Sequence, residues 1–377
     1  QPNRIESMVD IKIQYLYGRS FFASVSMDKK VKLAHEYYLN KCKIDWQEQI
    51  NQTQSMIAVV LNRNKNVSKA KSIMKSLKDN ATQSDEMGMY WDTQYAGYYW
   101  YDAPIETQAL MIEAFAEVLN DTKSVEELKI WLLKSKQTQN WKTTKATADA
   151  CYALLMNGTD ILSSDQLVEI SIGGELVSSS TIDTGAEAGT GYIKNSWSGG
   201  DVLSKMGDIK IKKSNKGIAW GAMYWQYFEQ MDKITPNQSP LSIKKELYKE
   251  VISSGSKKLI PIENEQLEVG DKVIVRIVLN SDRDMEYVHL KDMRAASFEP
   301  INVISRYKYQ DGLGYYESTG DAATNFFMDR VRKGTYVFEY PLRVNIKGSY
   351  SNGISSVQCM YAPEFTANSK GLSVIVK

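Results

Sequence analysis

The sequence predicts a multidomain α + β protein in which a partial α/α toroid is followed by two antiparallel domains of the β-sandwich type. Three observations lead to this prediction. Apolar residues recur with a helical period up to about residue 158, a Trp–Thr pattern occurs three times in that stretch, and the period changes to two after residue 160. At 377 residues the chain is long enough for two or three domains.

The helical half follows from the spacing of its apolar residues. Pro104 suits a first helical turn, because its missing N–H would have no partner there. Ser124 and Glu127 match a capping box at the start of another helix, with Ser124 as the N-cap. The clearest helix is predicted over 105–119, whose apolar face carries Ile105, Ala109, Ile112, Ala116 and Leu119. Further helices are expected at about 8–22, 29–41, 47–62, 67–79 and 144–156.

The Trp–Thr pattern reads WQEQINQTQSMI at 46–57, WYDAPIETQALM at 100–111 and WKTTKATADACY at 141–152. The Thr follows the Trp by seven residues in the first two copies and by six in the third. Each Thr falls in a first helical turn, where its hydroxyl is expected to accept a backbone N–H. The copies lie 54 and 41 residues apart, which is room for about two helices. Helical hairpins bury their apolar faces against one another, so the repeats predict part of an α/α toroid or a related solenoid.

After residue 160 the pattern becomes that of β-strands. Residues 336–346 alternate strictly, and Pro341 within them indicates an edge or a bulge. Residues 272–279 and 285–291 are predicted to form a hairpin. Earlier strands are expected at 166–173, 191–197, 207–213 and 217–229. The Pro-containing stretch TPNQSPLS (235–242) indicates a boundary, so the predicted domains are 1–160, 161–238 and 239–377.

Composition and charge argue against several classes of function. The formal net charge is +1, and residues 1–160 hold 20 of the 46 basic and 19 of the 45 acidic residues. A nucleic-acid-binding protein normally concentrates its basic residues in one domain, so that class is not favoured. No run approaches the roughly 18 apolar residues of a membrane span. The chain begins QPNRIESMVD, without an initiator Met or an apolar leader, which is typical of a mature product or an excised fragment.

The cysteines and histidines are too few and too scattered to predict a zinc site or a disulfide framework. Cys151 and Cys359 have neighbours that predict buried, inert thiols. His35 is expected to be a partly exposed helix residue, with general-base chemistry as the alternative. His289 is expected in a strand without an acidic partner. Cys42 is considered below, with the thioester motif.

Two acidic clusters contain the oxygen ligands that calcium prefers, but neither has the signature of a calcium-binding loop, so solvated turns are expected. They are Asp282, Asp284 and Glu286, and Glu263, Glu265 and Glu268. The stretch SIGGELV (171–177) lacks the GK[ST] ending of a phosphate-binding loop and predicts a Gly-Gly hairpin. No catalytic, cofactor-binding or metal-binding residue is assigned from the sequence.

Several stretches resemble a known family, the bacterial alpha-2-macroglobulin-like proteins. The stretches similar to the second half of their thioester-bearing toroid are DEMGMYW (85–91), IETQALMIEAF (105–115) and NWKTTKATADACYALL (140–155). GTGYIKNSW (189–197) and AWGAMYWQYFE (219–229) resemble the β domain that follows. The longest and most specific set resembles the terminal macroglobulin-like β-sandwich: YVHLKDMRAASFEP (287–300), DGLGYYESTGDAATNFF (311–327), KGTYVFEYPLRV (333–344) and QCMYAPEF (358–365). The resemblance covers most of 27–377.

The resemblance implies the C-terminal region of a peptidase inhibitor that acts as a molecular trap in the bacterial envelope. In that family a peptidase cuts a bait segment, the protein changes shape, and the peptidase is enclosed. The implied partners are target peptidases and other envelope proteins. The implied location is extracytoplasmic, in the periplasm or at the cell surface, with a lipid anchor in an upstream region. No enzymatic activity is expected, because no catalytic constellation assembles in the sequence, and no cofactor is expected.

The sequence departs from the family at the thioester. Many members carry Cys-Gly-Glu-Gln, where Cys and Gln lie three residues apart and meet across a tight turn. The most similar stretch of this sequence is CKIDWQEQ, in which Cys42 and Gln49 are seven residues apart. Covalent capture by Cys42 is therefore not expected. The motif of the family either lies upstream of this chain or is absent from this lineage, and the bait would also lie upstream.

Two other function classes stay open. The aromatic run YWDTQYAGYYWYD (90–102) is suited to stacking on sugar rings, and α/α toroids joined to β-sandwiches also occur in polysaccharide lyases. Turnover of uronic-acid polysaccharides would favour such a glycan-active enzyme. The third class is a structural module that docks to other envelope proteins, which a pull-down from envelope extract would identify.

Overall fold

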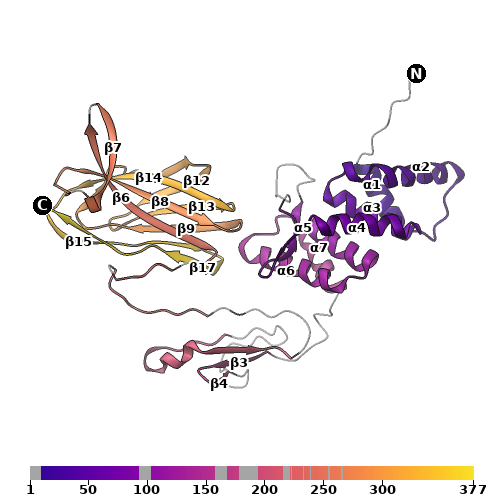
Figure 1. Ribbon diagram of the computed structural model, residues 1–377, viewed down its shortest axis with the longest axis horizontal. Helices are drawn as coiled ribbons and strands as arrows, with labels where there is room; N and C mark the ends of the chain where they lie inside the picture. Colours follow the sequence, from indigo (N-terminus) through magenta and orange to yellow (C-terminus); the bar gives the residue numbers. More distant parts are fainter. Residues whose placement is uncertain are drawn as a thin grey trace. The chain divides into compact units, whose positions relative to one another are not determined.

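The computed structural model describes residues 10–92, 103–157, 168–177, 194–214, 221, 223–231, 233–237, 239–253, 255–264 and 266–377. The chain divides into two compact units, one formed by 1–134 and 141–221 and the other by 135–140 and 222–377. Helices predominate in the first and antiparallel sheets in the second (Figure 1). This is the multidomain α + β class predicted from the sequence. The division into three domains stays a prediction.

Helices occur in the predicted order and close to the predicted bounds. The helix predicted over 105–119 forms as α5 followed by a π-helical turn, η2. The helices are α1 (Asp10–Ser20), α2 (Lys29–Asp45), η1 (Trp46–Glu48), α3 (Asn51–Arg63), α4 (Val67–Asp79), α5 (Pro104–Ala114), η2 (Phe115–Leu119), α6 (Thr122–Thr138) and α7 (Thr144–Met156).

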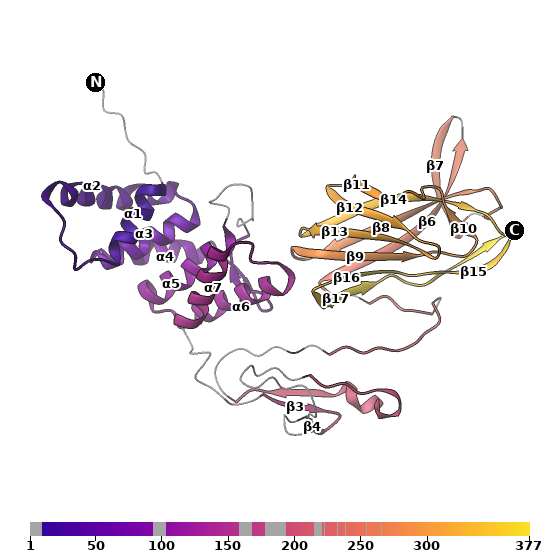
Figure 2. The same cartoon turned by 180° about the vertical axis from the view of Figure 1, so that it is seen from behind.

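Helix α3 lies at the centre of the helical core. Its residues Ile57–Leu61 are all fully buried, which requires neighbouring elements on more than one side. It packs against α1, α4 and α5, and α7 packs against α5 (Figure 2). The apolar stripe of α4 shows the usual helical spacing, with Ala70, Ile73, Met74 and Leu77 buried.

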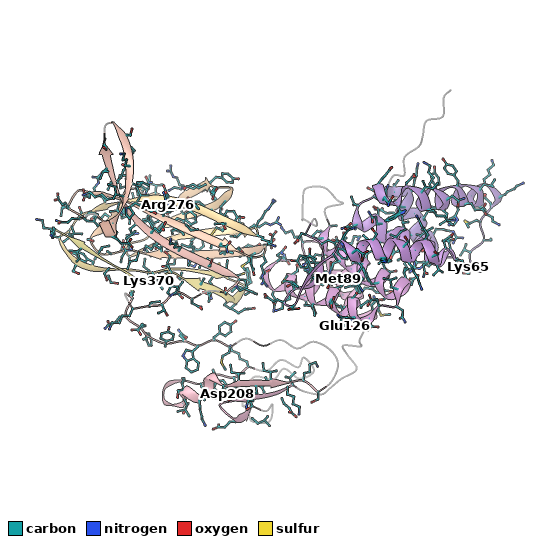
Figure 3. The ribbon with its side chains drawn as sticks, viewed as in Figure 1. Lys65, Met89, Glu126, Asp208, Arg276 and Lys370 are labelled. Carbon is teal, nitrogen blue, oxygen red and sulfur yellow. The ribbon has the colours of Figure 1, made fainter. Side chains whose placement is uncertain are left out.

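A short hairpin completes this core. It consists of β1 (Thr82–Ser84) and β2 (Gly88–Tyr90), and it buries Met89, which is labelled in Figure 3. The Gln108 side-chain amide donates to the carbonyls of Met89, at 2.9 Å, and Leu128, at 3.1 Å. One buried amide therefore joins the hairpin to α5 and α6.

The three Thr residues of the Trp–Thr pattern all make the same hydrogen bond, but in the opposite sense to that predicted. Each hydroxyl donates to a carbonyl three or four residues earlier instead of accepting a backbone N–H. A hydroxyl in a first helical turn reaches that carbonyl readily, so the prediction was wrong in polarity. The bonds run from Thr53 to Ile50 (3.0 Å), from Thr107 to Ala103 (2.7 Å) and from Thr147 to Thr143 (3.1 Å).

The tryptophans of the pattern precede helices as predicted wherever the structure describes them. Trp46 lies in η1 before α3 and is only 6% exposed, and Trp141 packs against the same core before α7. Trp100 lies outside the described residues. Both described copies therefore place an indole ring at the junction before a helix.

Helix α6 is capped by a different residue from the one predicted. Asp121 Oδ1 accepts the Ser124 backbone N–H at 3.1 Å, and Asp121 Oδ2 accepts the Ser124 hydroxyl at 2.8 Å. The helix begins at Thr122, so Ser124 lies inside the first turn. The prediction of Ser124 as N-cap was wrong, because the helix begins earlier, at Thr122, and Asp121 accepts the N–H of Ser124 in its first turn.

A small sheet follows the helices in sequence. Its order is β4 (Glu175–Val177), β3 (Glu169–Ile172), β5 (Ile209–Lys212). Gly173 and Gly174 have φ values of 60° and 84° and form the predicted two-residue hairpin turn. The strands predicted at 191–197 and 217–229 are not found in their described parts, because 194–198 and 223–230 lack ladder pairing.

The second unit is a sandwich of two antiparallel sheets over one apolar core. The first sheet has the order β10-β14-β8-β6-β7 and the second β11-β12-β13-β9-β16-β17. A separate ladder joins β15 to β18. The strands are β6 (Leu241–Ser253), β7 (Ser256–Pro261), β8 (Lys272–Ser281), β9 (Met285–Met293), β10 (Phe298–Pro300), β11 (Arg306–Gln310), β12 (Leu313–Thr319), β13 (Ala323–Val331), β14 (Gly334–Val344), β15 (Gly348–Gly353), β16 (Ser355–Cys359), β17 (Ala362–Asn368) and β18 (Leu372–Val376).

The predicted hairpin between 272–279 and 285–291 is wrong. Both segments are strands, but β8 pairs with β6 and β14, whereas β9 pairs with β13 and β16. The short connection between them crosses from one sheet to the other, and the Ser281 hydroxyl donates to the Arg283 carbonyl at 2.6 Å within it. Two alternating strands joined by a short polar turn can pair as a hairpin or can lie in the two facing sheets of a sandwich. The sequence pattern is the same in both cases.

The edge predicted at Pro341 is confirmed. Strand β14 pairs with β8 on one side along its length, but on the other side β10 covers only Leu342–Val344. Ahead of that point the N–H groups of Val337 and Glu339 bond to the side chains of Asp311, at 2.7 Å, and Gln310, at 3.0 Å. The nitrogen of Pro341 falls on the same uncovered side, where a missing N–H costs no ladder bond.

Candidate functional site

Cys42 lies in a buried place on α2. It is 1% exposed, and burial, reinforced by the negative charge of Asp45, raises the pKa of its thiol to about 12. The Gln49 amide donates to the Asp45 carbonyl at 3.4 Å. Since the thiolate is the nucleophilic form of cysteine, this environment opposes reactivity at Cys42.

Of the other two cysteines, Cys359 is buried and Cys151 is exposed. Cys359 is buried, as expected, and its Sγ lies 3.4 Å from the Glu286 carbonyl. Cys151 is exposed, which contradicts the prediction. Helix α7 buries Ala146, Ala150, Ala153 and Leu154, and a helix that turns those residues inward directs Cys151 outward.

The two histidines lie in separate parts of the fold, His35 on α2 and His289 on β9. His35 is only 9% exposed, so the prediction of a partly exposed residue was wrong, and burial followed by the charge of Arg19 lowers its pKa. His289 lies on β9, stacks on Phe327 at 4.7 Å and pairs with the Asn325 side-chain oxygen at 3.0 Å. Its partner is an amide, so nothing in this arrangement activates His289 as a base.

The acidic cluster at 282–286 engages arginines. Asp282 pairs with Arg283 at 2.8 Å, and Asp284 pairs with Arg330 at 2.7 Å. Glu263 lies in a short helical turn at Ile262–Asn264, and Glu265 lies outside the described residues. Among the residues that the structure describes, no three His, Cys, Asp or Glu side chains gather as a metal ion requires.

Sequence reasoning missed a charged network in the helical unit. Arg63 on α3 bonds to Glu113 at 2.8 Å, to Glu117 at 3.0 Å and to the Ser20 hydroxyl at 3.0 Å. Tyr17 donates to Glu113 at 2.6 Å, and burial together with that carboxylate raises the pKa of Tyr17. The network joins α1, α3, α5 and η2. Its bonded pairs lie up to 96 residues apart, so local spacing gave no signal for it.

A second missed cluster lies in the core of the sandwich. Lys245 Nζ on β6 is 2.6 Å from Asp292 Oδ1 on β9, and the two side chains are 1% and 0% exposed. Ser355 donates its hydroxyl to Asp292 Oδ1 at 2.6 Å, and the Tyr340 hydroxyl donates to Asp292 Oδ2. Lys245 also donates to the Met293 carbonyl at 2.5 Å. The cluster joins strands of both sheets through one carboxylate.

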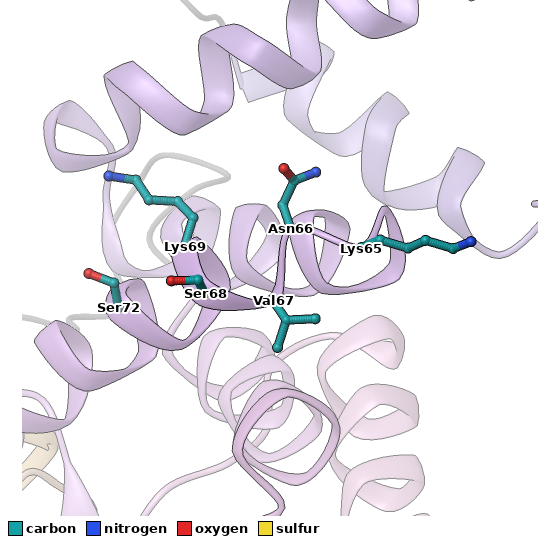
Figure 4. Close-up of a pocket in the computed structure, with 6 residues that line it drawn as sticks. All are labelled: Lys65, Asn66, Val67, Ser68, Lys69 and Ser72. Atoms are coloured by element: carbon teal, nitrogen blue, oxygen red, sulfur yellow. The ribbon is translucent and has the colours of Figure 1, made fainter.

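A shallow hollow lies at the start of α4, and its two lysine side chains do not point into a common site. It is lined by Lys65, Asn66, Val67, Ser68, Lys69 and Ser72. Figure 4 shows the two lysine side chains pointing in opposite directions, and the Lys69 ammonium lies over the Trp46 ring, 5.4 Å from its centre. The lysines do not converge on a common point, so the hollow is not assigned as a binding site.

None of the described helices has the length and apolar character to cross a membrane.

A comparison with family models matches residues 241–364 to the bacterial alpha-2-macroglobulin MG10 domain. The match begins at the first residue of β6 and ends within β17, so it covers the sandwich described above except for the end of β17 and β18. Residues 241–364 are thus similar to an MG10 domain. The resemblance to the C-terminal part of bacterial alpha-2-macroglobulins is confirmed by this match.

Solved alpha-2-macroglobulins resemble the chain at low identity. Trypsin-activated Escherichia coli alpha-2-macroglobulin is 13% identical with a TM-score of 0.39, covering 99% of this chain and 26% of that one. Salmonella alpha-2-macroglobulin reacted with methylamine is 13% identical with a TM-score of 0.30, covering 100% and 23%. The chain thus spans about a quarter of these structures.

One curated protein also matches part of the chain. Circularly permutated Ras protein 2 of Dictyostelium discoideum is 22% identical over 111 residues, which are 29% of this chain and 3% of that protein.

Proposed function

We propose that the chain is the C-terminal region of an alpha-2-macroglobulin-like peptidase inhibitor of the bacterial envelope. The observation that supports this most directly is the match of residues 241–364 to an MG10 domain. Solved relatives include E. coli alpha-2-macroglobulin activated by trypsin and by porcine elastase. The proposal transfers that response to peptidases to the longer protein of which this chain would be a part.

The helical unit is proposed to be part of an α/α toroid. Support comes from apolar side chains left on the surface at both ends of the helical series. Leu33 and Ile44 on α2 are 60% and 74% exposed, and Tyr152 and Met156 on α7 are 57% and 66% exposed. Surfaces of this kind commonly mark contacts with further elements, and additional toroid helices would cover them.

Within this proposal the chain contributes no covalent capture of its own. The buried Cys42 thiol, with its raised pKa, is a poor nucleophile and a poor precursor for a thioester. Methylamine treatment of the chain is therefore expected to leave its mass unchanged. A mass increase that disappears in a Cys42→Ala variant would contradict the assignment.

The protein is proposed to act outside the cytoplasm, in the periplasm or at the cell surface, with a lipid anchor supplied upstream of this chain. Target peptidases are its proposed partners. Fractionation of cells that produce the longest native form tests the location. Recovery in the soluble cytoplasmic fraction would contradict it.

The inhibitor proposal is tested by capture of trypsin. The longest native form of the protein is incubated with active trypsin and separated by size-exclusion chromatography. Trypsin should elute with the large protein. Trypsin inactivated beforehand at its active-site serine is the control, because it cannot cut a bait and should elute alone. Equal elution of both forms, or of neither, with the large protein would contradict a cleavage-triggered trap.

The glycan-active alternative depended on the aromatic run at 90–102, of which 93–102 lie outside the described residues. It stays a hypothesis. Incubation with uronic-acid polysaccharides remains its test.

A further inference from the structure

The core of the sandwich contains a lysine and an aspartate in direct contact with no access to solvent. Lys245 projects from β6 in one sheet, and Asp292 projects from β9 in the other. The amine nitrogen and a carboxylate oxygen are 2.6 Å apart. In the ladders, Lys245 lies opposite Ile277, and Asp292 lies opposite Ser355 and Thr324. The contact therefore spans the interior of the sandwich.

An ion pair in such a place is costly. Transfer of an ammonium and a carboxylate out of water carries a penalty of several kcal/mol for each ion, and mutual attraction repays it only with good geometry. The domain around the pair has a large apolar core. A neutral linkage between the same two groups would remove both charges and keep the two sheets joined.

The neighbouring groups are placed to assist such a linkage. The hydroxyl of Tyr340 donates to Oδ2 of Asp292, and Ser355 donates to Oδ1. Tyr340 is buried, and burial together with Asp292 raises its pKa, so it stays protonated and remains a donor. Two fixed donors on one carboxyl group stabilise the negative charge that develops on its oxygens when a nucleophile attacks the carbon. Fixed proximity of amine and carboxyl supplies the entropic advantage of an intramolecular reaction.

We propose that Lys245 and Asp292 condense to form an intramolecular isopeptide bond. One proton passes from the lysine ammonium to the carboxylate, which leaves a neutral amine and a neutral carboxylic acid. The amine nitrogen attacks Cγ of Asp292, and the bond from Cγ to Oδ1 breaks. Oδ1 leaves as water with two protons that originate from the ammonium group. The net change is loss of one water, with no oxidant, reductant or other reactant.

The product keeps two of the hydrogen bonds that surround the pair, whereas the Ser355 hydroxyl loses its acceptor Oδ1. The amide nitrogen keeps one hydrogen, which is directed to the Met293 carbonyl that Lys245 already contacts. The remaining oxygen, Oδ2, keeps the hydrogen bond from Tyr340. The linked residues are 47 positions apart in sequence, 292 minus 245. The bond would therefore act as a covalent clamp between the two sheets.

The test is the intact mass of the full chain, purified in its folded form and then denatured. The expected mass is lower than the sequence mass by one water. Tryptic digestion should lack cleavage after Lys245 and yield one branched peptide that contains both Lys245 and Asp292. An unchanged mass, with separate peptides for the two residues, would overturn the proposal and leave a simple buried ion pair.

Two variants locate the linkage. Lys245→Arg removes the nucleophilic amine and should restore the full sequence mass of the variant. Lys308→Arg is the matched control, because Lys308 also forms a nearly buried pair, with Glu317 at 2.7 Å, in the same domain. Its mass should still be lower by one water. If Lys245→Arg fails to fold, the digest of the unaltered chain alone decides the question.

Discussion

Gly88 is the residue whose environment restricts substitution most clearly. Its φ is +71°, and a Cβ atom there would lie 2.1 Å from the Glu127 carbonyl oxygen of α6. We expect Gly88→Ala to lower the free energy of unfolding by roughly 2–4 kcal/mol, through backbone strain and a backbone clash. Urea denaturation measures this.

Gly18→Ala is the control in the same unit. Gly18 lies in α1, and nothing is within 4 Å of a Cβ placed there. The alanine should raise stability by about 0.5–1 kcal/mol, as expected for a helical position. A loss at Gly18 as large as the loss at Gly88 would refute the steric argument.

His35 should make stability depend on pH. Burial, followed by the charge of Arg19, lowers its pKa in the folded chain. The unfolded chain then binds the proton more readily, so stability is complete above the ordinary histidine pKa and falls as pH drops through about 6.5, by at most about 1.4 kcal/mol per pH unit. Denaturation midpoints measured from pH 8 to pH 5 should show this slope.

The slope should diminish in a His35→Leu variant and persist when the other histidine is replaced, in His289→Gln. These are the two histidines of the chain. A slope unaffected by His35→Leu would assign the pH dependence to other groups.

The environments of single residues were only partly predictable from the sequence. The neighbours of Cys151 are small and apolar, yet its position relative to Ala150 and Leu154 on α7 places it outside. Helical spacing could have shown this. Lys245 and Asp292 carry no such signal, because their contact depends on two strands from different sheets.

At the scale of elements, the N-terminus of α6 depends on Asp121. Asp121→Ala should cost about 1–2 kcal/mol, because it removes the acceptor for the Ser124 N–H. Asp121 also pairs with Lys78 at 2.6 Å, so Lys78→Ala is needed to separate that contact from the cap.

Glu127→Ala is the control for the predicted capping box, because it removes the side chain that would bond back to Ser124. Stability should change by less than about 0.5 kcal/mol, as for most surface substitutions. A cost at Glu127 that matches the cost at Asp121 would restore the sequence-based cap at Ser124.

Helices were predicted well and strand pairing was not, for a physical reason. A helix buries a stripe defined by residues three and four apart, so α4 and α7 can be read from local spacing. A strand's partner depends on residues far along the chain. Strands β8 and β9 were located correctly, but their assignment to separate sheets is invisible in their alternation. The cap at Asp121 was missed because Asp121 and Ser124 are both good N-cap residues three positions apart, and local sequence does not decide which of them begins the helix.

At the scale of the whole molecule, the sequence indicated the family through long stretches of the sandwich. The stretches at 287–300, 311–327 and 333–344 correspond to β9 and β10, to β12 and β13, and to β14, and all lie within the MG10 match. The fold requires the alternating core residues of these strands, and it tolerates Pro341 where β14 lacks a partner on one side. The sequence did not indicate a functional site, since the clusters at Arg63 and at Lys245 assemble from distant segments.

We propose that this chain belongs to a protein that encloses peptidases. Such a protein leaves the active site of trypsin intact but keeps large molecules away from it. The most direct measurement compares trypsin activity on a short chromogenic peptide and on a large protein substrate, after incubation with the longest native form. We predict that peptide cleavage persists while protein cleavage is lost. Equal loss of both activities, or no loss of either, would contradict the claim.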